Sequence, residues 1–204
     1  MLVKLKDYER IHRIISSLAR HEGNDPAYSC MWFSVFGAHI LQHHFKAKPK
    51  VRCGLAAYYV GGENEVLCFG ELTETGVTGA LGNFHCWVEV DDWVIDFMAP
   101  AFPALLAPSM IIRPLMFQKR ASEMATHIND LSHPGDFFLL PTDGLTEERL
   151  KQFWEYPIYG DLAEICAQWF SKSPKKIRPE IGMLDNFGKQ VAVSLTGPSV
   201  RGRW

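Results

Sequence analysis

The chain has 204 residues, of which 47% are hydrophobic and 22% are charged, so it is long enough to bury one core. Its formal charge of −2 lacks the basic excess that is typical of nucleic-acid binding. The basic residues of 172–178 are interleaved with Ser and Pro, which indicates a solvated loop. We therefore expect a single domain, 1–204, with no nucleic-acid partner.

Cysteine usage and the N-terminal segment indicate a compartment. The five cysteines are an odd number without close pairing motifs, which argues against a disulfide framework. Residues 1–23 mix charges throughout and lack the apolar block of a signal peptide. The sequence contains no run of about 18 or more apolar residues, which is the length needed to span a bilayer. These features predict a cytoplasmic protein with no membrane partner.

Two helices are predicted first along the chain. The first runs to about Arg20, and its apolar residues recur at helical spacing in one stripe: Tyr8, Ile11, Ile15 and Leu18. The turn-rich segment HEGNDPAY ends it. The next segment, SCMWFSVFGAHILQHHF, is apolar almost all round, which predicts a helix buried on most sides.

A sheet and a mixed C-terminal half follow. The runs VRCGLAAYYV and EVLCFGEL flank GGEN as in a hairpin, and FHCWVEV and WVIDF predict a second hairpin. After a proline-rich crossing, a strand in GDFFLLPTDG, helices at about 145–154 and 159–170, and a strand at VAVSL are expected. The sum is an α+β fold, with an N-terminal helix (1–23), a core (24–100) and an extension (101–204) that completes the domain.

The second hairpin brings a histidine and a carboxylate together. With a two-residue loop at 91–92, Val90 faces Trp93, and side chains alternate between the two faces of the strands. His85 and Asp96 then share one face as diagonal neighbours, about 7–8 Å apart at the backbone. A hydrogen bond between them would stabilise an imidazolium, as a catalytic triad requires. The alternative is a surface His and a surface Asp.

Cys30 is the candidate nucleophile. Ser29 is a good N-cap, which would place Cys30 in the first helical turn, where backbone amides favour a thiolate. Asp25-Pro26 offers a competing helix start one turn earlier. The alternative for Cys30 is a buried structural cysteine, and the other four cysteines fit that description better: Cys53, Cys68, Cys86 and Cys166.

The segments around these residues resemble known families. NDPAYSCMWFSVFGA resembles the nucleophile block of papain-like cysteine peptidases, and the hairpin is similar to the transglutaminase-like core, where His-Ala-Trp-Val-Glu-Val is followed by Trp and Leu-Asp. The resemblance covers 24–100 and implies a papain/transglutaminase-like fold, with the nucleophile helix packed on an antiparallel sheet. It implies that Cys30 is the nucleophile, His85 the general base and then acid, and Asp96 its orienting partner. Asn24 stands where the family has an oxyanion Gln.

The resemblance also implies the reaction class. We expect a cysteine hydrolase or acyltransferase that acts on a peptide, protein or small amide through a thioester, without a cofactor. His39 and His43 are four apart, but the zinc-hydrolase pattern needs Glu directly after the first His and Ile40 stands there, so no metal is expected and a zinc-dependent hydrolase is the weaker alternative. A non-catalytic transglutaminase-like scaffold that binds a protein or peptide is the alternative, and thiol reactivity distinguishes it from an enzyme.

Overall fold

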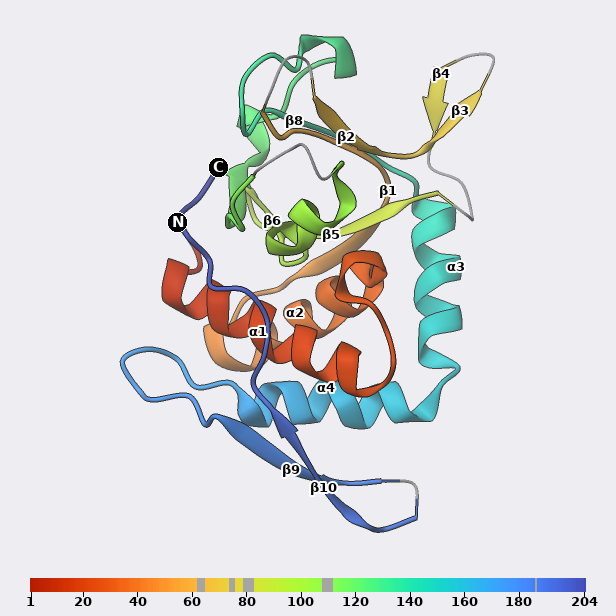
Figure 1. Ribbon diagram of the computed structural model, residues 1–204. Coiled ribbons are helices and arrows are strands. Elements are labelled where there is room, and N and C mark those ends of the chain that lie inside the picture. The colour runs from red at the N-terminus through yellow and green to blue at the C-terminus, as the bar shows by residue number, and fades with distance from the viewer. Residues whose placement is uncertain (62–64, 74–75, 79–82, 108–111, 186) are drawn as a thin grey trace.

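The structure is a computed structural model that describes residues 1–61, 65–73, 76–78, 83–107, 112–185 and 187–204. A curled antiparallel sheet lies against a layer of helices (Figure 1). The six-stranded sheet has the order β2-β1-β5-β6-β7, and β8 also pairs with β1. Two shorter ladders, β3 with β4 and β9 with β10, stand apart from it. The α+β class expected from the sequence is confirmed.

Four α-helices carry most of the helical layer: α1 (Leu5–His21), α2 (Cys30–Phe45), α3 (Asp143–Trp154) and α4 (Pro157–Trp169). Short 3-10 turns connect other elements: η1 (Pro26–Tyr28), η2 (Ala99–Leu105), η3 (Ala121–Glu123) and η4 (Ile128–Asp130). The stripe predicted for the first helix is fully buried, and α2 packs against α1, α4 and the sheet. Both predicted N-terminal helices are therefore present.

The strands are β1 (Lys50–Tyr59), β2 (Val66–Phe69), β3 (Glu71–Thr73), β4 (Gly76–Thr78), β5 (His85–Val90), β6 (Trp93–Asp96), β7 (Phe117–Arg120), β8 (Phe137–Pro141), β9 (Glu180–Leu184) and β10 (Gln190–Ser194). The turn predicted at GGEN lies largely outside the described residues, although β1 and β2 pair antiparallel on either side of it. Strands β7 and β9 were not expected, because neither has the strict alternation of a half-buried strand.

The register of the β5–β6 hairpin is as predicted. Val90 pairs with Trp93, and the next two pairs along the ladder continue the same register. Asp91 in the two-residue loop has φ +52, the left-handed conformation that the first central position of a primed hairpin turn requires. His85 and Asp96 consequently lie on one face of the hairpin.

Helix α2 packs on the opposite face. The thiols of Cys53 and Cys86, which are paired across β1 and β5, lie 3.6 Å and 3.2 Å from Sδ of Met31 on α2. Nearly two turns further along the helix, Gly37 lies so close to Phe97 that a Cβ there would be 2.3 Å from the ring. A glycine at this position lets the helix approach the sheet and fixes its height above it.

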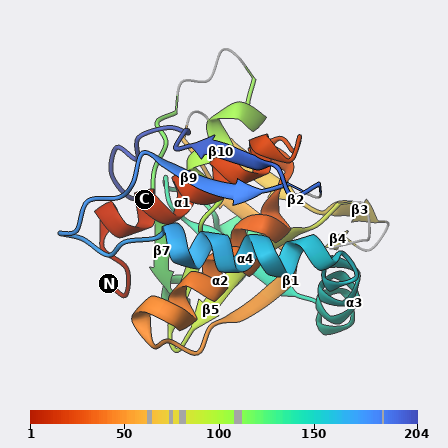
Figure 2. The same ribbon diagram turned by 90° about the horizontal axis from the view of Figure 1, so that it is seen from below.

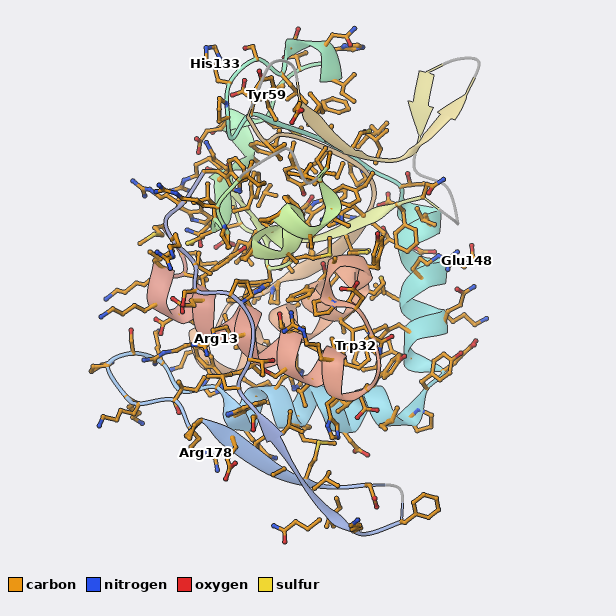
Figure 3. All side chains as sticks on the ribbon, viewed as in Figure 1. Arg13, Trp32, Tyr59, His133, Glu148 and Arg178 are labelled. Carbon is orange, nitrogen blue, oxygen red and sulfur yellow. The ribbon has the colours of Figure 1, made fainter. Side chains whose placement is uncertain are left out.

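The C-terminal half completes this core. Strand β7 forms the edge beside β6, β8 adds to β1, and α4 lies alongside α2 (Figure 2). The indole of Trp32 on α2 packs edge-on against Tyr159 of α4, in the buried layer between the helices (Figure 3). Among the described residues, no helix combines the length and the apolar character needed to cross a membrane.

Candidate active site

Asp96, the last residue of β6, has a fully buried carboxylate that is held by three donors. His85 lies 2.6 Å from Oδ2 through its Nε2, and the Tyr58 hydroxyl donates to the same oxygen at 3.0 Å. The backbone N–H of Met98 donates to Oδ1 at 2.9 Å. The hydroxyl of Tyr8 donates to the backbone carbonyl of Asp96. The carboxylate is therefore fixed in one orientation, and it fixes the imidazole in turn.

His85 is enclosed by aromatic rings. Its imidazole stacks on Phe69 with ring centroids 4.2 Å apart, and Tyr58 and Phe102 approach it from other sides. Burial by itself disfavours the charged ring, but the negative charge of Asp96 and its hydrogen bond override it and raise the pKa of His85 to about 10. His85 is therefore an imidazolium at neutral pH.

Cys30 is the first residue of α2, and two local bonds set this helix start. The Asp25 side chain accepts from the Ala27 N–H at 2.9 Å and so begins η1, the competing start seen in the sequence. Ser29 occupies the position before α2, as predicted, but its hydroxyl donates to the Asp25 carbonyl and makes no cap bond. Cys30 is thus in the first turn of α2, where backbone N–H groups lack intrahelical acceptors.

The Cys30 thiol is half-buried and lies beside Cys86 and His85. A hydrogen bond from Cys86, together with the nearby, positively charged imidazole of His85, outweighs burial and lowers the pKa of Cys30 to about 5. The Cys86 S–H also lies near Met31, but a thiolate is the stronger acceptor of a single donor. Nδ1 of His85, the nitrogen opposite Asp96, makes no aligned hydrogen bond within the described part of the chain. Such loose contacts are usual before substrate binds.

The pKa of Cys30 is lowered and that of its neighbour His85 is raised. Cys30 loses its proton above a pH of about 5, and His85 keeps its proton up to about 10. Between these values the pair is a thiolate beside an imidazolium, which is a nucleophile beside a proton donor.

A pocket of about 380 Å³ opens on Cys30 and His85. Its other described lining residues are mostly apolar and carry no charged side chain: Ala27, Tyr28, Cys68, Phe69, Gly70, Asn83, Phe84, Met98 and Leu105. Tyr28 is 78% exposed, so its ring stands at the rim and is available to a bound molecule. The pocket therefore favours a neutral, largely apolar group next to the thiol.

The structure brings Cys30, His85 and Asp96 together, as predicted, but it places Asn24 elsewhere. Asn24 is exposed, its backbone N–H donates to the Ala19 carbonyl at 2.8 Å, and it is not among the described residues that line the pocket. The backbone N–H of Cys30 itself, at the start of α2, is the donor next to the thiol.

Two cysteines differ from the sequence analysis. Cys68, interpreted as a buried cysteine, is exposed, because β2 lies at an edge of the sheet. Cys86 is buried as expected, but it also contacts Cys30, which the apolar pattern of its strand face did not reveal. In the sequence, this contact is indicated only by the position of Cys86 directly after His85. Burial raises the pKa of Cys86 well above its usual value, so it is a thiol that donates and not a second thiolate.

Metal-type ligands gather at the other end of α2. His39, His43 and Glu164 form a group whose ligand atoms lie within 4.8 Å of one another. Glu164 belongs to α4, so a sequence pattern that requires a glutamate directly after the first histidine does not include it. This group lies outside the pocket residues.

Comparison with known proteins gives one family and one close structure. The family described as "Protein of unknown function (DUF2026)" matches residues 4–204. A solved structure, "The crystal structure of genomics APC5867", is 45% identical and superposes with a TM-score of 0.91. The alignment covers 100% of this chain and 98% of that chain. No curated protein is significantly similar to the chain. The fold is thus shared over the full length with a solved structure.

Proposed function

The chain belongs to the DUF2026 family of proteins of unknown function, and we propose that it is a cysteine-nucleophile hydrolase or acyltransferase. Its donor is an amide or peptide, and the acyl group passes through a thioester on Cys30. The observation that carries the proposal is the row of Cys30, His85 and Asp96, in which the thiol pKa is lowered and the imidazole pKa is raised. Opposed shifts on adjacent groups in a pocket are a property of functional sites.

The first half-reaction follows from the charges of the pair. The Cys30 thiolate attacks the carbonyl carbon, a C–S bond forms, and the carbonyl π electrons move onto oxygen. The Cys30 backbone N–H donates to that oxyanion. His85 then gives the proton on Nδ1 to the leaving nitrogen as the C–N bond breaks, which leaves a thioester and a neutral imidazole.

The second half-reaction reverses these roles. Neutral His85 takes a proton from water or an amine through Nδ1, and that molecule attacks the thioester carbon. The C–S bond breaks, and its electron pair leaves with sulfur as the Cys30 thiolate. Throughout both steps the Nε2–H remains bonded to Asp96, which stabilises the imidazolium whenever it forms.

We extend the proposal to the fold class, a papain/transglutaminase-like fold. It is supported by the order Cys, His, Asp along the chain and by the start of the nucleophile helix at Cys30. The β5–β6 register, which places His85 and Asp96 on one face, is a third argument. Each of these features agrees with the resemblance of residues 24–100 to the papain-like and transglutaminase-like families.

The pocket points to the substrate class. Apart from the reacting pair, Cys30 and His85, its described lining offers no charge to pair with a charged acyl group, and a charge that loses water without a partner is costly. Phe69, Phe84 and Leu105 instead offer apolar and aromatic surface. We propose that the acyl part of the donor is neutral and apolar or aromatic.

The test is the intact mass of the protein after incubation with activated esters and amides of apolar, acidic and basic acyl groups. We expect an acyl adduct with the apolar donors, its loss when an amine is added, and no adduct in Cys30→Ala. The matched control is Cys166→Ala, which removes a buried thiol in α4 and should leave the adduct unchanged. Absence of an adduct with every donor, or an adduct on another cysteine, would favour the non-catalytic scaffold.

A further inference from the structure

The end of α2 away from Cys30 carries two histidines one helical turn apart. His39 and His43 project from the same face, with ring centroids 4.3 Å apart. Glu164 of α4 faces them: its Oε1 lies 2.9 Å from Nε2 of His39 and 3.9 Å from Nε2 of His43. Three ligand-type atoms from two helices thus converge on one place.

The spacing suits a metal ion. A tetrahedral zinc ion binds imidazole nitrogen and carboxylate oxygen at about 2.0–2.2 Å, which puts neighbouring ligand atoms about 3.3–3.5 Å apart. The distances of 2.9 Å and 3.9 Å from Glu164 to the two histidines lie on either side of that value. Small side-chain rotations would therefore bring all three atoms to one ion.

The partner pattern of His39 points the same way. Its Nε2 is buried, yet it has no aligned hydrogen bond in the described part of the chain, although Glu164 lies at hydrogen-bond distance. A ring nitrogen in this position is free to bind a metal ion.

The third histidine near the end of α2, His44, is already hydrogen-bonded to another group. Nε2 of His44 lies 2.8 Å from the Ala167 carbonyl and so already ties the end of α2 to α4. This bond sets the two helices side by side and leaves the pair of His39 and His43 facing Glu164. The imidazole nitrogens favour zinc or a similar transition metal over calcium or magnesium, which prefer oxygen ligands only.

We propose that His39, His43 and Glu164 bind a divalent transition-metal ion of the zinc type, which joins α2 to α4. Two nitrogens and one oxygen are the protein ligands, and water takes the fourth position. The site lies nine residues along α2 from Cys30, about 13 Å at the helical rise, so it takes no part in thioester chemistry. It is independent of the proposed function.

The experiment is a calorimetric titration with Zn²⁺ in protein that carries Cys30→Ser, because a thiolate beside a histidine would itself bind zinc. We expect one equivalent of bound zinc and a raised Tm, since a ligand that binds the folded state stabilises it. His43→Ala and Glu164→Gln change half-exposed or exposed side chains and should keep the fold. Each should weaken zinc binding by at least about tenfold, as even outer-shell changes cost that much.

The matched control is His133→Ala, which removes an exposed histidine that also has a carboxylate nearby, Asp136 at 3.7 Å, but that belongs to no three-ligand group within the described residues. Its zinc affinity should stay within about twofold of the parent, below the cost of an outer-shell change. Two results would overturn the proposal. One is the absence of zinc binding at a concentration of about 100 µM, and the other is an unchanged zinc affinity in both His43→Ala and Glu164→Gln. Acyl-adduct formation in EDTA reports on Cys30 alone and should be unaffected, so the two proposals fail separately.

Discussion

Two buried histidines lie near the end of β6, and one is neutral whereas the other is positively charged. His12 of α1 donates from Nδ1 to the carbonyl of Phe97 at 2.8 Å, whereas Nε2 of His85 bonds the carboxylate of the preceding residue, Asp96. Both imidazoles are fully buried. Burial lowers the pKa of His12 to about 4, but at His85 the same burial is overridden and the pKa rises to about 10.

The difference shows what decides the charge of a buried histidine. A backbone carbonyl opposes the effect of burial at His12 without reversing it, so that ring stays neutral and serves the core. A carboxylate supplies a full negative charge, and Cys30 adds its own when it is ionised. One residue along the chain, from Asp96 to Phe97, therefore separates a neutral buried histidine from a charged one.

The strongest way to break this comparison is Asp96→Asn. The substitution keeps a hydrogen-bond acceptor of the same size but removes the charge, so His85 should behave like His12 and be neutral at pH 7. We expect turnover of an apolar acyl donor to fall by roughly 10³–10⁴ while the fold persists. The measurement combines steady-state kinetics with NMR titration of the His85 ring.

Its control is His12→Leu, which removes the other buried histidine and leaves the Phe97 carbonyl without its donor. That variant should lose about 1–3 kcal/mol of unfolding free energy, measured in urea, and keep turnover within about twofold. If Asp96→Asn retained full turnover, or if His12→Leu lost as much as Asp96→Asn, the distinction between the two sites would be wrong.

A smaller effect is expected from Cys86→Ala. The hydrogen bond from Cys86 is the largest cause of the lowered pKa of Cys30, so its removal should raise that pKa. A thiolate exists above its pKa, so an upward shift of one to two units would slow alkylation at pH 6 by about two- to tenfold. Iodoacetamide labelling with peptide mapping measures this, with Cys166→Ala as the control. An unchanged rate would remove Cys86 from the site.

The parts that the sequence predicted are local along the chain. The two-residue loop at 91–92 fixes the β5–β6 register, and the register alone places His85 and Asp96 on one face. The switch from turn residues to an apolar run likewise placed the start of α2 within one turn of Cys30. In both cases neighbouring residues carry the whole signal.

The parts that it could not predict depend on distant contacts. Tyr58 donates to Asp96 from a strand 38 residues earlier, and Phe69 covers His85 from the sheet edge. Glu164 meets His43 only because α4 returns alongside α2, 121 residues later in the chain. Periodicity shows which face of an element is apolar, but it does not show which element will cover that face.

The most direct test of the central claim is the pH dependence of iodoacetamide alkylation at each cysteine of the native protein. Cys30 should lose reactivity only as the pH falls through about 5, because its thiolate is present above that value. A second change is expected near pH 10, where His85 loses its proton. Cys68 is an exposed residue, but its thiol is partly buried, which raises the pKa of that thiol. Its alkylation rate should therefore rise only in alkaline solution. A single Cys30 midpoint near the ordinary thiol value of about 8.5, or faster labelling of Cys68 at pH 6, would contradict the thiolate–imidazolium pair.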